Sequence, residues 1–232
     1  MMSLPNEIVA RGVAETVLVV GAPGSGKTTL LFDRMLSLVG SGTPVDNLLA
    51  LTPSRAQASV LRDRLGLALD VTTQGPRARS LAAFAFALVT SAHREHGLVA
   101  PDLLSASQID ADIEALLLGH IHDGGGPQWP EPLNETVRGL RVFRAELREW
   151  IARTTENGLS HERIAEIAHD HTRPEWVAAS EFAGEYRRVM ASARPGAFDS
   201  AEIIRRALVV LEDGLPADFA HLTHLLVDDR WT

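Results

Sequence analysis

The sequence predicts an α/β fold in which a parallel sheet is interrupted by an all-helical segment. Short apolar runs at Val17–Val20, Asn47–Leu51 and Leu222–Val227 are followed by glycine or polar residues, as buried strands often are. Apolar residues at helical spacing follow the first two runs, so strands and helices alternate as in a parallel sheet. Between about residues 93 and 195, helical patterns follow one another without a strand-like run. We therefore expect an α/β domain with a helical insertion.

Length and composition limit the class of protein. The 232 residues, of which 45% are hydrophobic, suffice for one large or two small domains. A formal net charge of −8 argues against binding duplex DNA through bulk charge alone. The absence of cysteine excludes disulfides and thiolate metal sites. Since no apolar run reaches the ~18 residues of a membrane span and no signal peptide pattern is present, we expect a cytoplasmic protein.

The junction between the first apolar run and the first helix is a phosphate-binding loop. Residues 17–29 read VLVVGAPGSGKTT, which matches the pattern G-x-x-x-x-G-K-[ST]. Glycines can turn their amides toward a phosphate, and the first N–H groups of the helix have no partner inside it. The alternative is a glycine-rich turn without a ligand, against which the flanking strand and helix argue. The predicted nucleotide-binding residues are Gly21, Ala22, Pro23, Gly24, Ser25, Gly26, Lys27, Thr28 and Thr29.

Two side chains of this loop have specific expected roles. Lys27 would place a point charge at the β- and γ-phosphates, and Thr28 would offer its hydroxyl to Mg²⁺. Lys27 is the only lysine in the chain, whereas arginine is frequent. This bias indicates a position where the planar guanidinium of arginine cannot replace a compact ammonium.

Helical spacing predicts the elements that follow the loop. The polar stretch Val71–Arg79 is expected to be a connection, and Leu133–Ala152 to be one amphipathic helix. The last apolar run leads into Asp228 and Asp229, which we interpret as a Mg²⁺ site rather than a solvated turn, because a phosphate loop lies upstream. The expected helices are Lys27–Val39, Ala56–Leu65, Ser80–Val89, Ser107–Leu118, Leu133–Ala152, Ser160–His169, Glu175–Ala191 and Ala201–Leu211.

Four segments, taken in order, resemble superfamily 1 UvrD/Rep-type DNA helicases, and more closely the RecB-like helicase–nucleases of actinobacteria. GAPGSGKT at 21–28 is similar to the family's phosphate loop, and LLVDDR at 225–230 to its Walker B strand. LLALTPSRAQASVLRDRL at 48–65 and ARSLAAFAFALV at 78–89 are similar to two motifs that face DNA in the family. The resemblance implies a RecA-like P-loop NTPase domain, 1A, at 1–92, a helical 1B domain at 93–195, and a return to 1A at 196–232.

The resemblance also implies a function. The family couples Mg-ATP hydrolysis to translocation on single-stranded DNA and to duplex unwinding in repair and recombination. Lys27 would hold the phosphates, Thr28 and Asp228 the Mg²⁺, and Asp229 the attacking water. The expected partners are single-stranded DNA, a duplex junction and a second helicase–nuclease subunit, without a membrane. The residues expected to contact DNA are Thr52, Pro53, Ser54, Arg55, Arg79 and Ser80.

The sequence departs from the family at several places, which include Ala82 near a position where the family commonly has histidine and Asp229 where it has the glutamate of Walker B. The family recognises adenine with a glutamine upstream of the phosphate loop, but no glutamine precedes Gln57 in this sequence. A second glutamine, which belongs to Walker B in the family, is replaced here by Trp231. The chain stops before the 2A domain, whose arginines stabilise the transferring phosphoryl group in the family. We therefore expect a truncated product or fragment that binds ATP and does not unwind DNA alone. The alternative is a non-catalytic nucleotide-binding or scaffolding module.

Other residues invite a function but favour a structural interpretation. The arginines at 138, 141, 144 and 148 recur at helical spacing, so they are expected on one side of a helix. They could bind the DNA backbone as a track, or they could form a face exposed to solvent. The glutamates between them favour the solvent-exposed face. The histidine pairs lack the spacing of a zinc site. Trp129, Trp150 and Trp176 could stack on bases, but their apolar helix faces favour the core.

Overall fold

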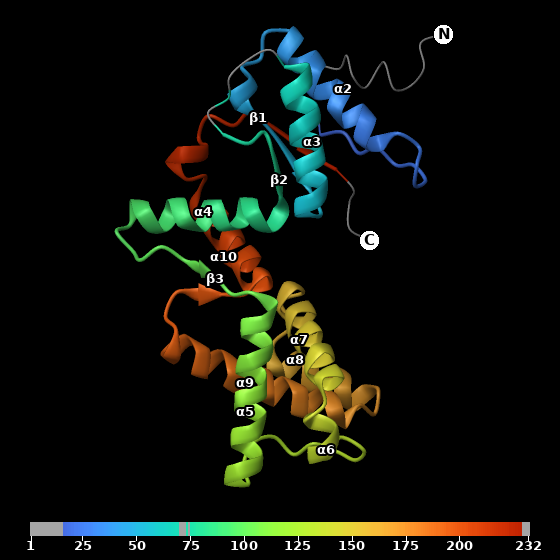
Figure 1. Ribbon diagram of the computed structural model, residues 1–232, viewed down its shortest axis with the longest axis vertical. Helices are drawn as coiled ribbons and strands as arrows, with labels where there is room; N and C mark the ends of the chain where they lie inside the picture. Colours follow the sequence, from blue (N-terminus) through green and yellow to red (C-terminus); the bar gives the residue numbers. More distant parts are fainter. Residues whose placement is uncertain (1–15, 70–72, 74, 229–232) are drawn as a thin grey trace. The chain divides into compact units, whose positions relative to one another are not determined.

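The computed structural model describes residues 16–69, 73 and 75–228 (Figure 1). These residues form two compact units. The first comprises the described residues up to Leu88 and those from Leu215 onward, and the second comprises Val89–Gly214. Helix α4, Leu81–Glu95, continues along the chain from the first unit into the second. No helix among the described residues has the length and apolar character needed to cross a membrane.

The first unit contains a parallel sheet with the order β2-β1-β5. The strands are β1, Leu48–Thr52, β2, Ala78–Ser80, and β5, His224–Val227. All residues of β1 are buried, because this strand lies between the other two and is apolar along nearly its whole length. The register pairs Thr52 with Ser80 and Leu51 with Val227, so all three strands end at the same edge of the sheet.

Two helices complete the core of the first unit. Helix α2, Lys27–Gly40, and helix α3, Arg55–Ala68, lie side by side next to the sheet (Figure 1). Short 3₁₀ turns at Val45–Asn47 and Ala217–Phe219 each come a few residues before a strand. The buried core of this unit consists of Met35, Leu38, Leu48, Ala50, Leu61, Leu65 and Ala78.

Two expectations about this sheet were wrong. Val17–Val20 has no strand assignment, and its side chains are 36% to 84% exposed. The apolar run satisfies the pattern of a buried strand, but no described strand pairs with it, and β5 has exposed Leu225 and Val227 side chains. The expected connection Val71–Arg79 also contains most of β2, which is too short and too polar to be recognised from an apolar run.

The second unit is mainly helical. Its helices are α5, Ala106–Asp123, α6, Glu135–Arg138, α7, Arg141–Glu156, α8, His161–Asp170, α9, Pro174–Ala193, and α10, Ser200–Asp213. Side chains of Ser105, Asn134, Ser160 and Asp199 cap four of these helices, each accepting a hydrogen bond from a backbone N–H of the first turn. The main core consists of Ile113, Leu117, Leu147, Ile151, Ala179, Phe182, Ala183 and Tyr186.

The helical unit differs from expectation in three respects. Leu133–Ala152 is not one helix, because the chain leaves the helical path at Gly139 and Leu140 between α6 and α7. A short strand, β3, Asp102–Leu103, lies in the region expected to lack strands, and it pairs in parallel with β4, Ala197–Phe198, just beyond that region. Residues 196–214 belong to this unit rather than to the first, because β4 pairs with β3 and α10 packs on α7.

The expected solvated face of arginines is wrong at Arg144, although Arg141 is exposed as expected. Arg138 lies on α6, whereas the other three arginines lie on α7. Arg144 is only 8% exposed. Its guanidinium lies 3.0 Å from the carboxylate of Glu114 and 3.7 Å from that of Asp110, and it donates a hydrogen bond to the Gly139 carbonyl. This arginine joins α5 to α7 and is no longer a candidate for a DNA track.

Candidate nucleotide site

The loop that precedes α2 has the conformation that its glycines permit. Gly24 and Gly26 adopt φ angles of 78° and 90°, which residues with a side chain rarely adopt. A Cβ on Gly21 would lie 2.5 Å from the hydroxyl oxygen of Ser25. The turn is closed by a 3.1 Å hydrogen bond from the Ser25 amide to the Ala22 carbonyl. The backbone conformation therefore requires glycine at Gly24 and Gly26, whereas at Gly21 a side chain would collide with that of Ser25.

Helix α2 begins without a side-chain cap. Gly26 is its N-cap residue and has no side chain that could accept from the first amides. The helix is 14 residues long, so its dipole favours an anion at this end. The loop residues 21–26 are exposed. Ligand atoms could reach the amides from solvent, in agreement with the expected role of Ala22, Pro23 and Ser25 as part of a loop that uses its backbone.

The ammonium of Lys27 bends back over the loop. Its Nζ atom donates hydrogen bonds to the carbonyl oxygens of Gly21, at 3.0 Å, and Ala22, at 3.1 Å. The side chain thus spans the concave side of the loop from the first residue of α2. A phosphate oxygen bound there would take the place of these carbonyl oxygens.

Thr28 and Asp228 come together although 200 positions separate them in the sequence. The Thr28 hydroxyl lies 2.9 Å from Oδ1 and 3.0 Å from Oδ2 of Asp228. Asp228 follows β5 directly and is 4% exposed, and its amide donates to the Leu51 carbonyl of β1. The sheet therefore fixes the carboxylate, and α2 brings the hydroxyl to it.

This oxygen pair fits Mg²⁺. A hydroxyl and a carboxylate are hard ligands, and Mg²⁺ in nucleotide sites takes few protein ligands and completes its shell with phosphate and water. Among the described residues there is no cluster of three or more histidine or carboxylate side chains that could hold a metal by itself. Asp229, the expected partner for the attacking water, lies outside the described residues.

The residues expected to contact DNA separate into buried and accessible groups. Thr52 is fully buried, and its hydroxyl donates to the Ser54 carbonyl at 2.9 Å. Ser80 is 4% exposed and accepts from the Ala83 amide at the start of α4. Both side chains stabilise the backbone at the ends of their strands and are too buried to contact DNA directly.

The accessible group comprises three residues just beyond the end of β1 and Arg79 within β2. Pro53 is half-buried, Arg55 is exposed, and Ser54 is the N-cap of α3, accepting from the Gln57 amide at 3.2 Å. Arg79 is half-buried, and its guanidinium lies 6.0 Å from the centre of the Phe219 ring. These four residues remain candidates for contact with a strand of DNA.

Two further arginines, absent from the sequence prediction, lie close to Arg79. Burial lowers the pKa of the Arg79 guanidinium, and the positive charges of Arg77 and Arg62 lower it further. Arg77 pairs with Asp46 at 3.4 Å, and Arg62 donates to the Ala78 carbonyl. The R-x-R spacing of Arg77 and Arg79 could have revealed this concentration of positive charge, had Ala78–Ser80 been recognised as a strand.

Comparison with known proteins agrees with this arrangement. The family model described as UvrD/REP helicase N-terminal domain matches residues 4–229. Among curated proteins, an ATP-dependent helicase/nuclease subunit from Lactobacillus gasseri is 45% identical over 49 residues, which are 21% of this chain and 4% of that protein. The protein of the same name from Enterococcus faecalis is 41% identical over 56 residues, or 24% of this chain and 4% of its own length.

The curated relatives are much longer than the part that matches. In each of these two pairs the matched segment spans only about 4% of the relative. The family model, by contrast, extends over nearly the whole of the chain, from ahead of the phosphate loop to the aspartates after β5. The chain therefore belongs to the UvrD/REP helicase N-terminal domain family.

Proposed function

We propose that this chain is the ATP-binding part of a UvrD-like DNA helicase, in which Mg-ATP hydrolysis drives movement along single-stranded DNA. The hydrogen bond between Thr28 and Asp228 carries the proposal. It joins the start of α2 to the end of β5, and so brings the phosphate loop and a buried carboxylate together. The relatives named as ATP-dependent helicase/nuclease subunits support the same activity.

The residues of the site would act as follows. Lys27 exchanges the carbonyls of Gly21 and Ala22 for phosphate oxygens, and the amides at the start of α2 donate to the same phosphates. Thr28 and Asp228 would hold Mg²⁺, which when bound offsets negative charge on the phosphates. Asp229, next in sequence to the buried carboxylate, would orient the attacking water.

The sheet would connect the nucleotide site to the residues proposed to contact DNA. Asp228 lies at the same edge of the sheet as Thr52 and Ser80, because the three parallel strands end together. In this proposal the first unit corresponds to the 1A domain and the helical unit to the 1B domain. Pro53, Ser54 and Arg55, just beyond the end of β1, and Arg79 within β2 would contact single-stranded DNA. The names of the relatives describe one component of a larger enzyme, which supports a second protein chain as partner.

The proposal is tested by titrating the chain with a fluorescent ATP analogue in the presence and absence of Mg²⁺. Lys27→Ala should weaken binding by about tenfold or more, because the charge at the phosphates is lost. Arg187→Ala, which removes an exposed cation from α9, serves as the matched control and should leave the affinity unchanged. Equal affinity for the wild-type chain and Lys27→Ala would refute a phosphate site at this loop.

Turnover separates the helicase proposal from a non-catalytic nucleotide-binding module. Phosphate release should rise when single-stranded DNA is added, and affinity for the strand should fall with increasing salt. A chain that binds nucleotide without any DNA-stimulated release, alone or joined to the remainder of a longer protein, would favour the non-catalytic module.

A further inference from the structure

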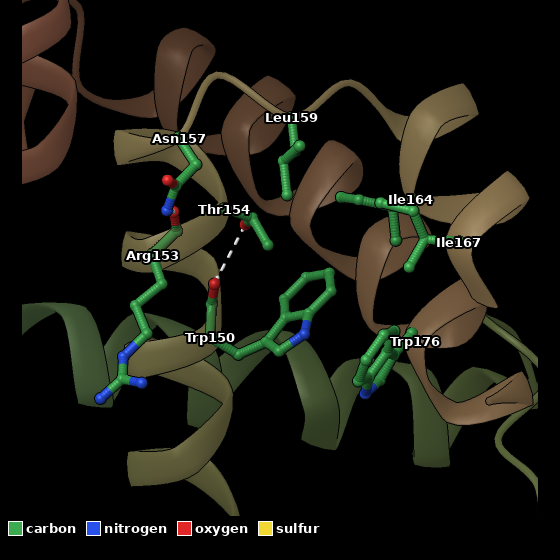
Figure 2. A pocket seen from close by; sticks show the side chains of 8 residues that line it. All are labelled: Trp150, Arg153, Thr154, Asn157, Leu159, Ile164, Ile167 and Trp176. Carbon is green, nitrogen blue, oxygen red and sulfur yellow. Dashed lines mark hydrogen bonds between the residues drawn. The ribbon is translucent and has the colours of Figure 1, made fainter. Parts of the chain in front are cut away.

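The helical unit contains an open pocket of about 220 Å³ that the nucleotide site does not explain (Figure 2). Helix α7 supplies one wall, α8 a second, and Trp176 near the start of α9 a third. Figure 2 shows the indoles of Trp150 and Trp176 at the same end of the pocket, with Ile164 and Ile167 above Trp176. Its lining residues are Trp150, Arg153, Thr154, Asn157, Leu159, Ile164, Ile167 and Trp176.

The pocket is lined mainly by apolar groups. Two of its polar side chains, those of Thr154 and Asn157, donate hydrogen bonds to backbone carbonyls of α7. The Thr154 hydroxyl donates to the Trp150 carbonyl at 3.0 Å, as drawn in Figure 2, and the Asn157 amide donates to the Arg153 carbonyl at 2.7 Å. Among the described residues that line it there is no carboxylate. The walls therefore suit a flat, weakly polar group and present no negative charge to it.

One arginine lies close in sequence to each of the two tryptophans, and Figure 2 shows the Arg153 side chain pointing outward from the edge of the pocket. Arg153 follows Trp150 by three residues on α7, and the Arg173 guanidinium lies 5.6 Å from the centre of the Trp176 ring. Both arginines are paired, Arg153 with Glu149 and Arg173 with Glu175. These arginine side chains are 72% and 55% exposed. Exposed pairs of this kind contribute little to stability, so a phosphate can compete for either arginine.

We propose that this pocket binds one unpaired base of single-stranded DNA, stacked against Trp150 and Trp176, with Arg153 and Arg173 on the adjoining phosphates. Proteins that bind single strands without reading sequence combine aromatic surfaces for the bases with cations for the backbone. A purely apolar side chain of a partner protein would form no hydrogen bond or ion pair with Arg153 and Arg173, whereas a nucleotide can do so through its phosphate. The inference rests on the proposed function, since that function supplies the strand.

The side chains of Trp150 and Trp176 are only half-buried, which modifies the expectation that they are core residues. Trp150 packs against the main core of the unit, as expected, but it also forms a wall of the pocket. Trp176 lines the pocket as well and is half-buried. Trp129 is half-buried as well, but it packs edge-to-face on Phe143 with ring centres 5.4 Å apart and does not line this pocket.

The test measures the affinity of the whole chain for a labelled oligothymidylate. Trp176→Leu keeps an apolar side chain but removes the stacking surface, and should weaken binding about tenfold, whereas Trp176→Phe should retain most of it. Arg153→Glu should also weaken binding. The matched control is Arg163→Glu on α8, an equally exposed arginine in a pair with Glu166 that does not line the pocket. Thermal unfolding of each variant checks that the unit is folded.

A strand with a single abasic site separates stacking from charge. The wild-type chain should bind the abasic strand more weakly when that site occupies the pocket, and Trp176→Leu should bind both strands alike. A strand containing one 2-aminopurine should lose fluorescence on binding the wild-type chain and keep it with Trp176→Leu.

The outcomes distinguish the inference from the proposed function. If wild type, Trp176→Leu and Arg153→Glu bind the strand equally, the pocket holds no base, while the proposed function survives. If the folded wild-type chain does not bind single strands at all, both fail. Should Trp176→Leu not fold, Arg153→Glu and the 2-aminopurine signal of the wild-type chain decide the question by themselves.

Discussion

The Thr28 hydroxyl donates to the buried carboxylate of Asp228, and this one hydrogen bond connects the beginning of the first unit to its end. The helical unit, Val89–Gly214, lies between the two residues in the sequence. The candidate site is therefore complete only when the chain returns to the sheet after that unit. Changes at either residue should act on metal and nucleotide together.

Asp228→Asn should remove the effect of Mg²⁺ on nucleotide affinity. The asparagine oxygen still accepts from Thr28, so the fold is kept, but the charge that favours a divalent cation is lost. We expect the affinity for the ATP analogue in Mg²⁺ to fall by about tenfold and the affinity in chelator to stay the same. Asp123→Asn, at an exposed position ending α5, is the control. Retention of the full Mg²⁺ effect would exclude Asp228 as a ligand.

Arg144→Ala should destabilise the helical unit by about 2–3 kcal/mol, because Glu114 loses its cation, Asp110 keeps only Arg148, and the hydrogen bond to the Gly139 carbonyl is removed. Arg141→Ala, at an exposed position one turn earlier on α7, should change the free energy of unfolding by less than ~0.5 kcal/mol. Urea denaturation of both variants measures the difference, and equal stabilities would contradict the role assigned to Arg144.

Tyr186 should make stability depend on pH at the alkaline end. It is the only tyrosine in the chain, and its hydroxyl is buried without a hydrogen-bond partner among the described residues. Burial raises the pKa of this hydroxyl above its usual range, and Asp112 and Asp199 raise it further, although Arg194 acts in the opposite direction. The folded state therefore favours the neutral phenol.

The sign of the effect follows from the two pKa values. Below about pH 10 the phenol is neutral in both states and its contribution is fully present. As the pH rises above that, the unfolded chain ionises while the folded chain does not, so the free energy of unfolding falls by about 1.4 kcal/mol per pH unit. Tyr186→Phe should lack this decline and be at least as stable at neutral pH. Identical alkaline profiles for the two proteins would show that Tyr186 does not titrate as described.

Nucleotide selectivity should be weak. The family's adenine-reading glutamine has no counterpart before Gln57, so the phosphate loop supplies most of the recognition. We expect ATP and GTP to compete for the fluorescent analogue with affinities within about threefold of each other, since neither base would find a dedicated hydrogen-bond partner. A preference for ATP of about a hundredfold would reveal an adenine contact made by another residue.

The parts of the structure that depend on local pattern were predictable. The phosphate loop, the start of α2 at Lys27 and the strand before Asp228 are each encoded within a few residues, by glycine, by helical spacing or by an apolar run. The contact between Thr28 and Asp228 follows once α2 and β5 are assigned to one α/β unit. The family resemblance supplied that assignment.

The parts that depend on packing were not predictable. Whether an apolar run pairs is decided by its neighbours, and Val17–Val20 has none among the described strands. Nothing in the spacing of Arg144 distinguishes it from its exposed neighbours, because its burial depends on carboxylates that α5 provides. Residues 196–214 join the helical unit through contacts with β3 and α7, which are distant in sequence.

The position of Lys27 has a chemical consequence for the whole chain. Since no other lysine exists, every reaction of a lysine side chain, whether acylation by a reagent or enzymatic acetylation, must occur at the phosphate loop. The ammonium contacts only exposed carbonyl oxygens there, so it is open to such reagents. A single acyl group would remove the charge and fill the loop. Lysine acylation of this chain would therefore block the proposed nucleotide site.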